Sequence, residues 1–166
     1  MRQRVMLLRT LYEKAIKHLE AGELDEAEET LQTYVRENPT DAMAHNKLGV
    51  VFVNRLNRDE AKRCFEEALK HDAYLIHALN NLGNIAREEG ELTLAIEYYQ
   101  KAIRINPDYP LPHNNLGVVY KQQNRYRDFI REIKIAKRLE HREVIYSKDK
   151  HTFRNWLTNF CSKSNK

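Results

Sequence analysis

The sequence predicts an all-α fold made of four consecutive helical hairpins. One observation is a 34-residue spacing, at which Leu48-Gly49 recurs as Leu82-Gly83 and as Leu116-Gly117. Another is a small-large-small pattern that recurs at the same spacing in Ala61 and Ala95, in Phe65 and Tyr99, and in Ala68, Ala102 and Ala136. A third is that turn-forming residues separate the helical segments. Such units bury a continuous core by stacking on their neighbours.

Each repeat is expected to contain two helices, the first with Leu-Gly and the second with the small-large-small set. Small residues let the helices approach, and Leu and aromatic side chains fill the remaining space. The repeats are predicted at about 8–41, 42–75, 76–109 and 110–143 of a single domain, 1–166. The turns between the two helices of each repeat are predicted at Gly22, Asn57, Gly90 and Asn124.

The two terminal repeats depart from this pattern. Repeat one has Lys14-Ala15 in place of Leu-Gly, although Ala27, Leu31 and Pro39 keep the pattern of its second helix. A first repeat lacks a preceding neighbour, so weaker similarity is expected there. Repeat four places Phe129 where the second helix has a small residue, which predicts a displaced helix.

A further amphipathic helix is predicted at about 148–161, with Phe153, Trp156, Leu157 and Phe160 on one face. Two interpretations stay open. The helix caps the end of repeat four, or its apolar face docks a partner protein, a second copy of the chain in a homo-oligomer, or a membrane surface.

Composition and charge set the class of protein. With 166 residues, 42% hydrophobic and 31% charged, the chain is expected to form one globular domain. The N-terminus offers no signal-peptide core or membrane span, so the predicted location is cytoplasmic. Cys64 and Cys161 have no CxxC partner and are expected to be free thiols. The net charge is +4, but residues 121–166 carry 13 Lys and Arg against 5 Asp and Glu.

The repeated residues resemble the tetratricopeptide repeat family, whose pattern is large-x-x-Leu-Gly-x-x-aromatic, followed by Ala, aromatic, Ala and Pro. The resemblance covers about residues 8–143. It implies a right-handed α-solenoid of antiparallel helix hairpins, with about nine helices including the C-terminal capping helix. It also implies an adaptor, scaffold or assembly factor that binds a segment of another protein in its concave groove, and not an enzyme.

The resemblance places the first helix of each repeat along that groove, where asparagine recurs at the 34-residue spacing. The peptide-binding residues that it implies are Asn46, Lys47, Asn80, Asn81, Asn84, Arg87, Asn114, Asn115 and Lys121. A side-chain amide both donates and accepts, which suits a peptide backbone, and asparagine is a poor residue inside a helix. The alternative is that these amides bond neighbouring helices or are inert.

Two known grooves of the family serve as references. The asparagine ladder is similar to that of O-linked N-acetylglucosamine transferases, although only Asn81 and Asn115 match its position and Lys47 departs from it. The clamp that holds acidic C-termini of chaperones is not matched, because Tyr12 and Ile16 stand where it requires Lys and Asn.

Other classes of function have weaker support in the sequence. His45 and His113 lie two repeats apart, which favours packing or capping at helix starts over a metal site. No cofactor motif or catalytic triad is expected. The alternative function is nucleic-acid binding by the basic C-terminal region, through Arg125, Arg127, Arg131, Lys134, Lys137, Arg138 and Arg142. Glu132, Glu140 and Glu143 dilute that charge, and stacking aromatic residues are missing from the groove positions.

Overall fold

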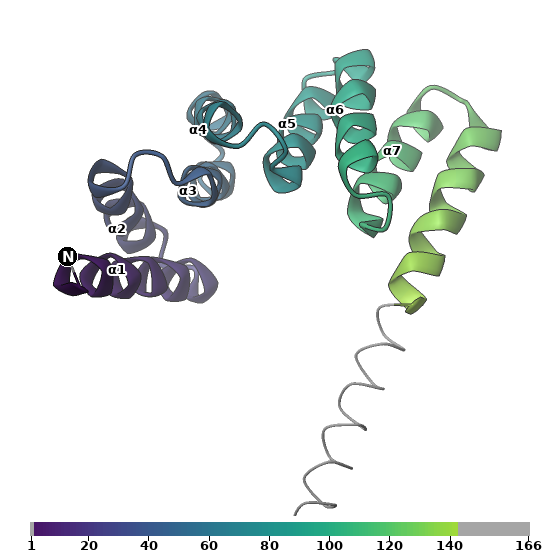
Figure 1. Cartoon of the computed structure of the whole chain (residues 1–166). Helices are drawn as coiled ribbons and strands as arrows, with labels where there is room; N and C mark the ends of the chain where they lie inside the picture. The colour runs from purple at the N-terminus through teal and green to yellow at the C-terminus, as the bar shows by residue number, and fades with distance from the viewer. Residues whose placement is uncertain (1, 143–166) are drawn as a thin grey trace, which may run out of the picture. The chain divides into compact units, whose positions relative to one another are not determined.

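The computed structural model describes residues 2–142 and confirms the all-α prediction, since these residues form helices joined by short turns and contain no strand. Figure 1 shows the helices in chain order: α1 Arg2–Ala21, α2 Leu24–Glu37, α3 Ala42–Asn54, α4 Arg58–His71, α5 Ile76–Glu88, α6 Leu92–Ile105 and α7 Pro110–Gln122, followed by a helix over 126–142. The predicted helix at 148–161, with Phe153, Trp156, Leu157 and Phe160, lies outside the described residues.

The chain divides into two compact units, Met1–Asn106 and Pro107–Lys166. In the first unit each helix from α1 to α6 packs against the next one in sequence. These helices form three hairpins, α1–α2, α3–α4 and α5–α6, which are joined in order in Figure 1. The described part of the second unit is a hairpin of α7 and the helix over 126–142.

Helix boundaries follow the 34-residue spacing. Helices α3, α5 and α7 have 13 residues each and begin at 42, 76 and 110, while α2, α4 and α6 have 14 residues each and begin at 24, 58 and 92. Helix α1 is the exception with 20 residues. Its first turns carry Val5, Met6 and Leu7, which are 66%, 73% and 66% exposed.

The Leu-Gly positions are where the two helices of a hairpin come closest. A Cβ atom built on Gly49 would lie 2.5 Å from the ring of Phe65, and one on Gly83 would lie 2.5 Å from the ring of Tyr99. Phe65 and Tyr99 are fully buried. The absence of a side chain on the first helix therefore lets the aromatic ring of the second helix lie directly on the backbone.

The predicted displacement of the second helix in repeat four is wrong. Ile133 faces Gly117, as Phe65 faces Gly49 and Tyr99 faces Gly83, and a Cβ on Gly117 would lie 3.0 Å from it. The register is kept because Phe129 is only half-buried and does not occupy the core. The Lys121 ammonium lies 5.8 Å from the centre of the Phe129 ring, which is within cation–π range.

The turns inside the hairpins contain Gly22, Asn57, Gly90 and Asn124, as the sequence predicts. Gly22 and Gly90 have φ angles of 76° and 82°, and Asn124 has a φ of 59°. In repeat two the left-handed residue is Leu56, with φ 60°, and not Asn57. Asn57 instead caps α4, where its side chain accepts a hydrogen bond of 3.4 Å from the Glu60 amide. Glycine and asparagine tolerate this conformation, whereas leucine is strained in it.

Two histidines tie the start of a first helix to the turn before it, in agreement with their predicted capping role. The Nε2 atom of His45 lies 2.8 Å from the Pro39 carbonyl oxygen, and that of His113 lies 3.1 Å from the Pro107 carbonyl oxygen. A carbonyl only accepts, so Nε2 donates the hydrogen bond to it in both residues. His113 also places Nδ1 2.8 Å from Oε2 of Glu132, and both side chains are 8% exposed.

Candidate functional site

A pocket of about 330 Å³ lies between α3 and α5 in the first unit. Its lining residues are Val53, Leu56, Arg58, Asn81, Asn84, Ile85 and Glu88. Val53 comes from the last turn of α3, Leu56 from the following loop and Arg58 from the start of α4, while α5 supplies the other four. The pocket therefore contains two of the asparagines that the sequence predicts as peptide-binding residues.

Both pocket asparagines have one amide atom bonded inside the protein. Nδ2 of Asn81 donates to Oδ1 of Asn46 at 3.1 Å, which links α5 to α3. Oδ1 of Asn84 accepts a 2.7 Å hydrogen bond from the hydroxyl of Tyr99, which lies behind it on α6. Asn84 thus keeps its NH₂ group for another partner, and Asn81 keeps its oxygen and one N–H. The pair offers both a donor and an acceptor.

The charged groups near the pocket are balanced. Nε of Arg58 lies 3.3 Å from Oε2 of Glu88, which joins the start of α4 to the end of α5. Arg87 lies beside the same carboxylate, at 3.7 Å. Burial raises the pKa of Tyr99 to about 12, while the nearby Arg87 guanidinium opposes the rise. The Tyr99 hydroxyl therefore stays protonated at neutral pH and continues to donate to Asn84.

Leu56 is a pocket residue that the sequence analysis missed. It is 82% exposed and adopts a left-handed conformation, and the neighbouring Val53 is 42% exposed. Leu56 occupies the 34-residue equivalent of Gly22, Gly90 and Asn124. Alignment of the repeats at single-residue precision would have identified it, because the other three residues at this position tolerate a positive φ.

The remaining predicted residues occupy different environments. Asn46 and Asn80 are buried, each 3% exposed. Lys47, Arg87 and Asn115 are half-buried, while Asn114 and Lys121 are exposed. Asn114, Asn115 and Lys121 belong to α7, in the second unit. The structure thus brings Asn46, Asn81 and Asn84 together at the pocket. Arg87 lies one helical turn after Asn84 on α5.

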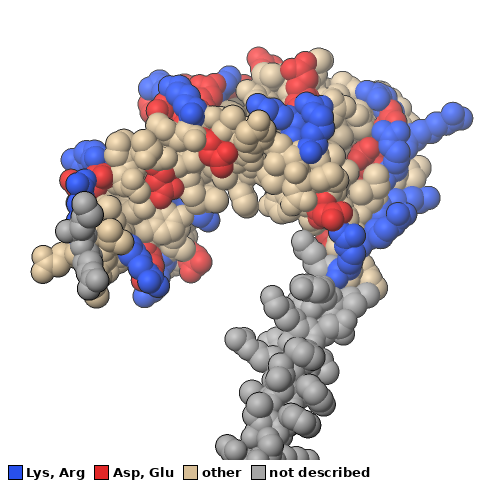
Figure 2. Space-filling view, in the orientation of Figure 1, with Lys and Arg blue, Asp and Glu red and all other residues tan. Residues whose placement is uncertain are grey.

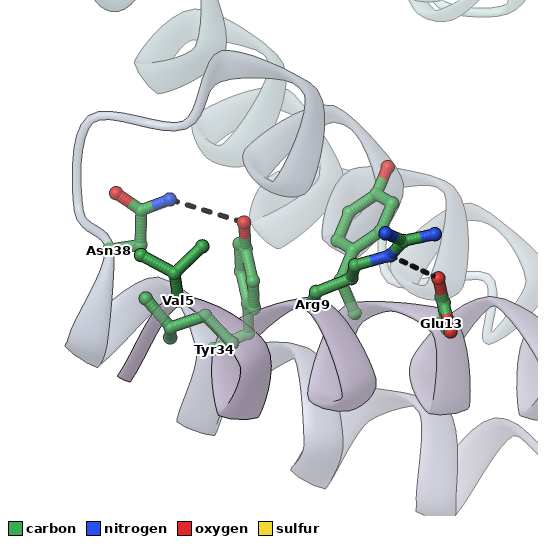
Figure 3. A pocket seen from close by; sticks show the side chains of 7 residues that line it. Val5, Arg9, Glu13, Tyr34 and Asn38 are labelled. Atoms are coloured by element: carbon green, nitrogen blue, oxygen red, sulfur yellow. Dashed lines mark hydrogen bonds and ion pairs between the residues drawn. The ribbon is translucent and has the colours of Figure 1, made fainter. Parts of the chain in front are cut away.

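A second pocket of about 440 Å³ lies on the first hairpin and is shown in Figure 3. Its lining residues are Val5, Leu8, Arg9, Tyr12, Glu13, Tyr34 and Asn38. The ring centroids of Tyr12 and Tyr34 are 5.2 Å apart, and the Asn38 amide donates to the Tyr34 hydroxyl at 3.1 Å. Tyr12 is the 34-residue equivalent of Asn46, so repeat one presents an aromatic ring where repeat two has an amide.

The basic residues of the second unit are partly neutralised. Arg125 and Arg131 both pair with Asp128, and Arg142 lies 2.8 Å from Asp108. Among the basic residues that the sequence predicts for nucleic-acid binding, Arg127, Lys134, Lys137 and Arg138 have no ion pair within the described residues. Figure 2 shows Lys and Arg in excess over Asp and Glu on the visible face of this hairpin.

Other features limit the chemistry that residues 2–142 offer. No helix in this range is long and apolar enough to cross a membrane. The same residues contain no group of three His, Cys, Asp or Glu side chains placed to hold a metal ion. Cys64 is a free thiol, and burial raises its pKa to about 12, so it remains a protonated and unreactive thiol at neutral pH. Cys161 lies outside the described residues.

Comparison with proteins of known sequence gives matches to helical-repeat proteins. Residues 12–58 and 83–124 match family models described as tetratricopeptide repeat and TPR repeat. The UDP-N-acetylglucosamine–peptide N-acetylglucosaminyltransferase of Giardia intestinalis is 40% identical over 62 residues, which are 37% of this chain and 4% of that protein. The photosystem I assembly protein Ycf3 of Prochlorococcus marinus is 29% identical over 97 residues, or 57% of this chain and 56% of that protein.

Solved structures show the same fold. The crystal structure of MamA is 24% identical and superposes with a TM-score of 0.73, over 84% of this chain and 81% of that one. The PilF structure from Pseudomonas aeruginosa is 20% identical with a TM-score of 0.76, over 90% and 72% of the two chains. These structures show the fold. The family-model matches over residues 12–58 and 83–124, with the 34-residue spacing, show that the chain belongs to the tetratricopeptide repeat family.

Proposed function

We propose that the pocket between α3 and α5 binds a segment of a partner protein, and that the chain acts as an adaptor or assembly factor. The observation that carries the proposal is Leu56, which is exposed and strained on the edge of this pocket. A non-glycine residue in the left-handed conformation costs on the order of 1 kcal/mol. A large apolar side chain that is kept in spite of this strain points to a functional role.

The pocket suits an extended segment with an apolar side chain. Val53, Leu56 and Ile85 provide apolar contacts, while Asn81 and Asn84 provide an acceptor and a donor for one peptide unit of the ligand. Asn46 is then a positioning residue, because its buried oxygen orients Asn81. The assembly role also draws support from the name of the photosystem I assembly relatives.

The proposal does not include catalysis. The relative named as a glycosyltransferase is matched over only 4% of its own length. The family models that match this chain describe tetratricopeptide repeats. The polar groups of the pocket are two amides and an ion pair between Arg58 and Glu88. Such groups bind and orient a ligand, but they form no nucleophile with an adjacent base.

Site-specific photo-crosslinking tests the proposal. A photoreactive amino acid at Val53 is expected to capture a partner from cell lysate, and Leu56→Gly in the same chain is expected to reduce the yield although it relieves backbone strain. Asn124→Gly is the matched control, since it changes the equivalent turn in the second unit. Equal yields from Leu56→Gly and the unaltered turn would show that Leu56 has no part in binding.

The same experiment separates protein binding from nucleic-acid binding. If the captured species is nucleic acid, its yield should fall steeply with salt concentration and depend on Arg127, Lys134, Lys137 and Arg138, which lack ion pairs within the described residues. A protein held by apolar contacts and amides is expected to depend only weakly on salt and to be insensitive to those four residues.

A further inference from the structure

The outer face of α6 carries two adjoining pockets that are separate from the pocket between α3 and α5. One, of about 530 Å³, is lined by Tyr74, Lys101, Arg104 and Ile105. The other, of about 450 Å³, is lined by Leu94, Glu97, Tyr98, Gln100, Lys101 and Arg104. Lys101 and Arg104 are common to both pockets. We call this region the outer α6 surface and define it by the residues that line the two pockets, Glu97 and Gln100 included.

The two cations differ from their equivalents in the other hairpins of the first unit. In repeat two the equivalent residues are Glu67 and Lys70, which form an ion pair at 2.5 Å along α4. In repeat one Arg36 donates a hydrogen bond of 3.2 Å to Thr33. In repeat three both positions are basic, and neither Lys101 nor Arg104 has an ion-pair or hydrogen-bond partner within residues 2–142.

Like charges three residues apart on a helix destabilise it by a few tenths of a kcal/mol. Where repeat two has the ion pair of Glu67 and Lys70, repeat three thus has two cations, Lys101 and Arg104, which line both pockets. An anionic group bound from outside the chain would remove the repulsion and complete the missing pairs. Arg104 suits a carboxylate especially well, because its guanidinium presents paired donors.

Tyr74 gives the surface an apolar component. Its ring is 72% exposed in the turn between α4 and α5, and its backbone amide donates to Oδ1 of Asp72 at 2.9 Å, which fixes the turn. The equivalent residues in the neighbouring turns are Thr40 and Asp108. Tyr74 is thus the only aromatic residue at this position of the three turns. It lines the same pocket as both cations and Ile105.

We propose that the outer α6 surface binds an acidic segment of a partner protein that carries an aromatic or aliphatic side chain. Carboxylates pair with Lys101 and Arg104, and the apolar side chain contacts Tyr74 and Ile105. Glu97 also lines the surface and repels any anion, so the surface suits a short segment that places its carboxylates on Lys101 and Arg104. A nucleic-acid strand fits less well, because two cations would leave most of its row of phosphates unpaired. The site would give the chain a second protein contact, used independently of the pocket between α3 and α5.

Fluorescence anisotropy with a fluorescein-labelled peptide tests this assignment. The probe is a short run of glutamate with one central phenylalanine, and a serine peptide with the same phenylalanine is the reference. Lys101→Glu reproduces the arrangement of repeat two and gives Arg104 an internal partner. It is expected to weaken binding about tenfold or more, a change typical of losing one strong charged contact.

Matched variants make the result specific. Arg36→Glu reverses a charge at the position equivalent to Arg104 in the first hairpin and should leave affinity unchanged. Tyr74→Ala should weaken binding of the phenylalanine probe more than that of a peptide of glutamate alone. Circular dichroism confirms that each variant is folded. The combination Asn81→Ala and Asn84→Ala should not affect the probe, which separates this site from the proposed function.

Three outcomes would overturn the assignment. The first is that the acidic probe does not bind the native chain. The second is that Lys101→Glu binds the probe as tightly as the native chain does. The third is that a single-stranded oligonucleotide displaces the probe at the same concentration as unlabelled peptide does. The last result would show a surface that recognises negative charge alone, without the apolar contact to Tyr74.

Discussion

The hydroxyl of Tyr99 reaches from the core to the pocket and donates a 2.7 Å hydrogen bond to the amide oxygen of Asn84. Tyr99 is also the ring that packs on Gly83. The equivalent pair in repeat two is Phe65 and Val50, which can form no such bond. One core residue of repeat three therefore supports the hairpin and orients a pocket amide.

Removal of that hydroxyl should separate these two roles. Tyr99→Phe is expected to lower the free energy of unfolding by roughly 1 kcal/mol, the usual net value of a hydrogen bond. It should weaken partner binding as well, because the Asn84 amide is then free to rotate. Denaturant unfolding and the photo-crosslink yield measure the two effects. Tyr98→Phe is the neighbouring control, since Tyr98 lines the outer α6 surface and makes no hydrogen bond to Asn84. Equal loss of crosslinking in both variants would contradict the orienting role.

The raised pKa of Tyr99 predicts a dependence of stability on alkaline pH. The unfolded chain releases the Tyr99 proton near the ordinary tyrosine pKa of 10.0, while the folded chain holds it until about 12. The unfolded state thus binds fewer protons in this window, and stability falls as pH rises from 10.0 to 12. The loss from this residue is on the order of 2 kcal/mol. In Tyr99→Phe, the fall in unfolding free energy between pH 9 and pH 11.5 should be smaller than in the native chain by about 2 kcal/mol. An equal fall in both proteins would contradict the prediction.

The strain at Leu56 predicts a stabilising substitution. Leu56→Gly is expected to raise the free energy of unfolding by up to about 1 kcal/mol, because glycine adopts a positive φ without steric cost and the lost side chain is mostly exposed. Thermal unfolding measures the effect. Asn57→Ala should act in the opposite direction, with a loss of about 1 kcal/mol, because it removes the cap of α4. A lower Tm for Leu56→Gly would show that the left-handed conformation is not strained.

Alanine substitutions at the glycines should rank according to what the new methyl group meets. Gly83→Ala places it 2.5 Å from the buried Tyr99 ring and is expected to destabilise the protein by about 1 to 3 kcal/mol. Gly117→Ala should cost less, because the atom that it meets is the end of the Ile133 side chain at 3.0 Å. Chemical denaturation of the two variants provides the ranking, and the reverse order would contradict the close helix contact at Gly83.

The buried pair of His113 and Glu132 should show strong energetic coupling. Both nitrogens of His113 face acceptors, and His113→Leu leaves the Glu132 carboxylate with only its contact to Arg131. The expected loss is on the order of 3 kcal/mol, as for other buried pairs broken on one side. The double change His113→Leu and Glu132→Tyr copies Leu79 and Tyr98 of repeat three and should recover much of it. A double-mutant cycle gives the coupling, and additive losses would show that the two residues act separately.

The helical fold was predictable because its signals are periodic. Leu-Gly and the small-large-small set report local packing, and packing requires the same residue types in each hairpin. The site was less predictable, because a shift of one residue along a helix turns a side chain from the surface into the core. Asn46 and Asn81 occupy adjacent repeat positions, yet Asn46 is buried and Asn81 reaches the pocket. Leu56 was missed because its importance lies in a backbone angle, which the residues in the turn do not reveal by their type.

The bonds from His45 and His113 to preceding proline carbonyls have a consequence for engineering the array. Repeat three has Ala73 and Leu79 at these positions, and Leu79 is fully buried, so its first helix is anchored by apolar packing. Successive hairpins thus alternate between polar and apolar anchors. Insertion or deletion of two adjacent hairpins would preserve that alternation, whereas insertion or deletion of one hairpin would place two anchors of the same kind next to each other.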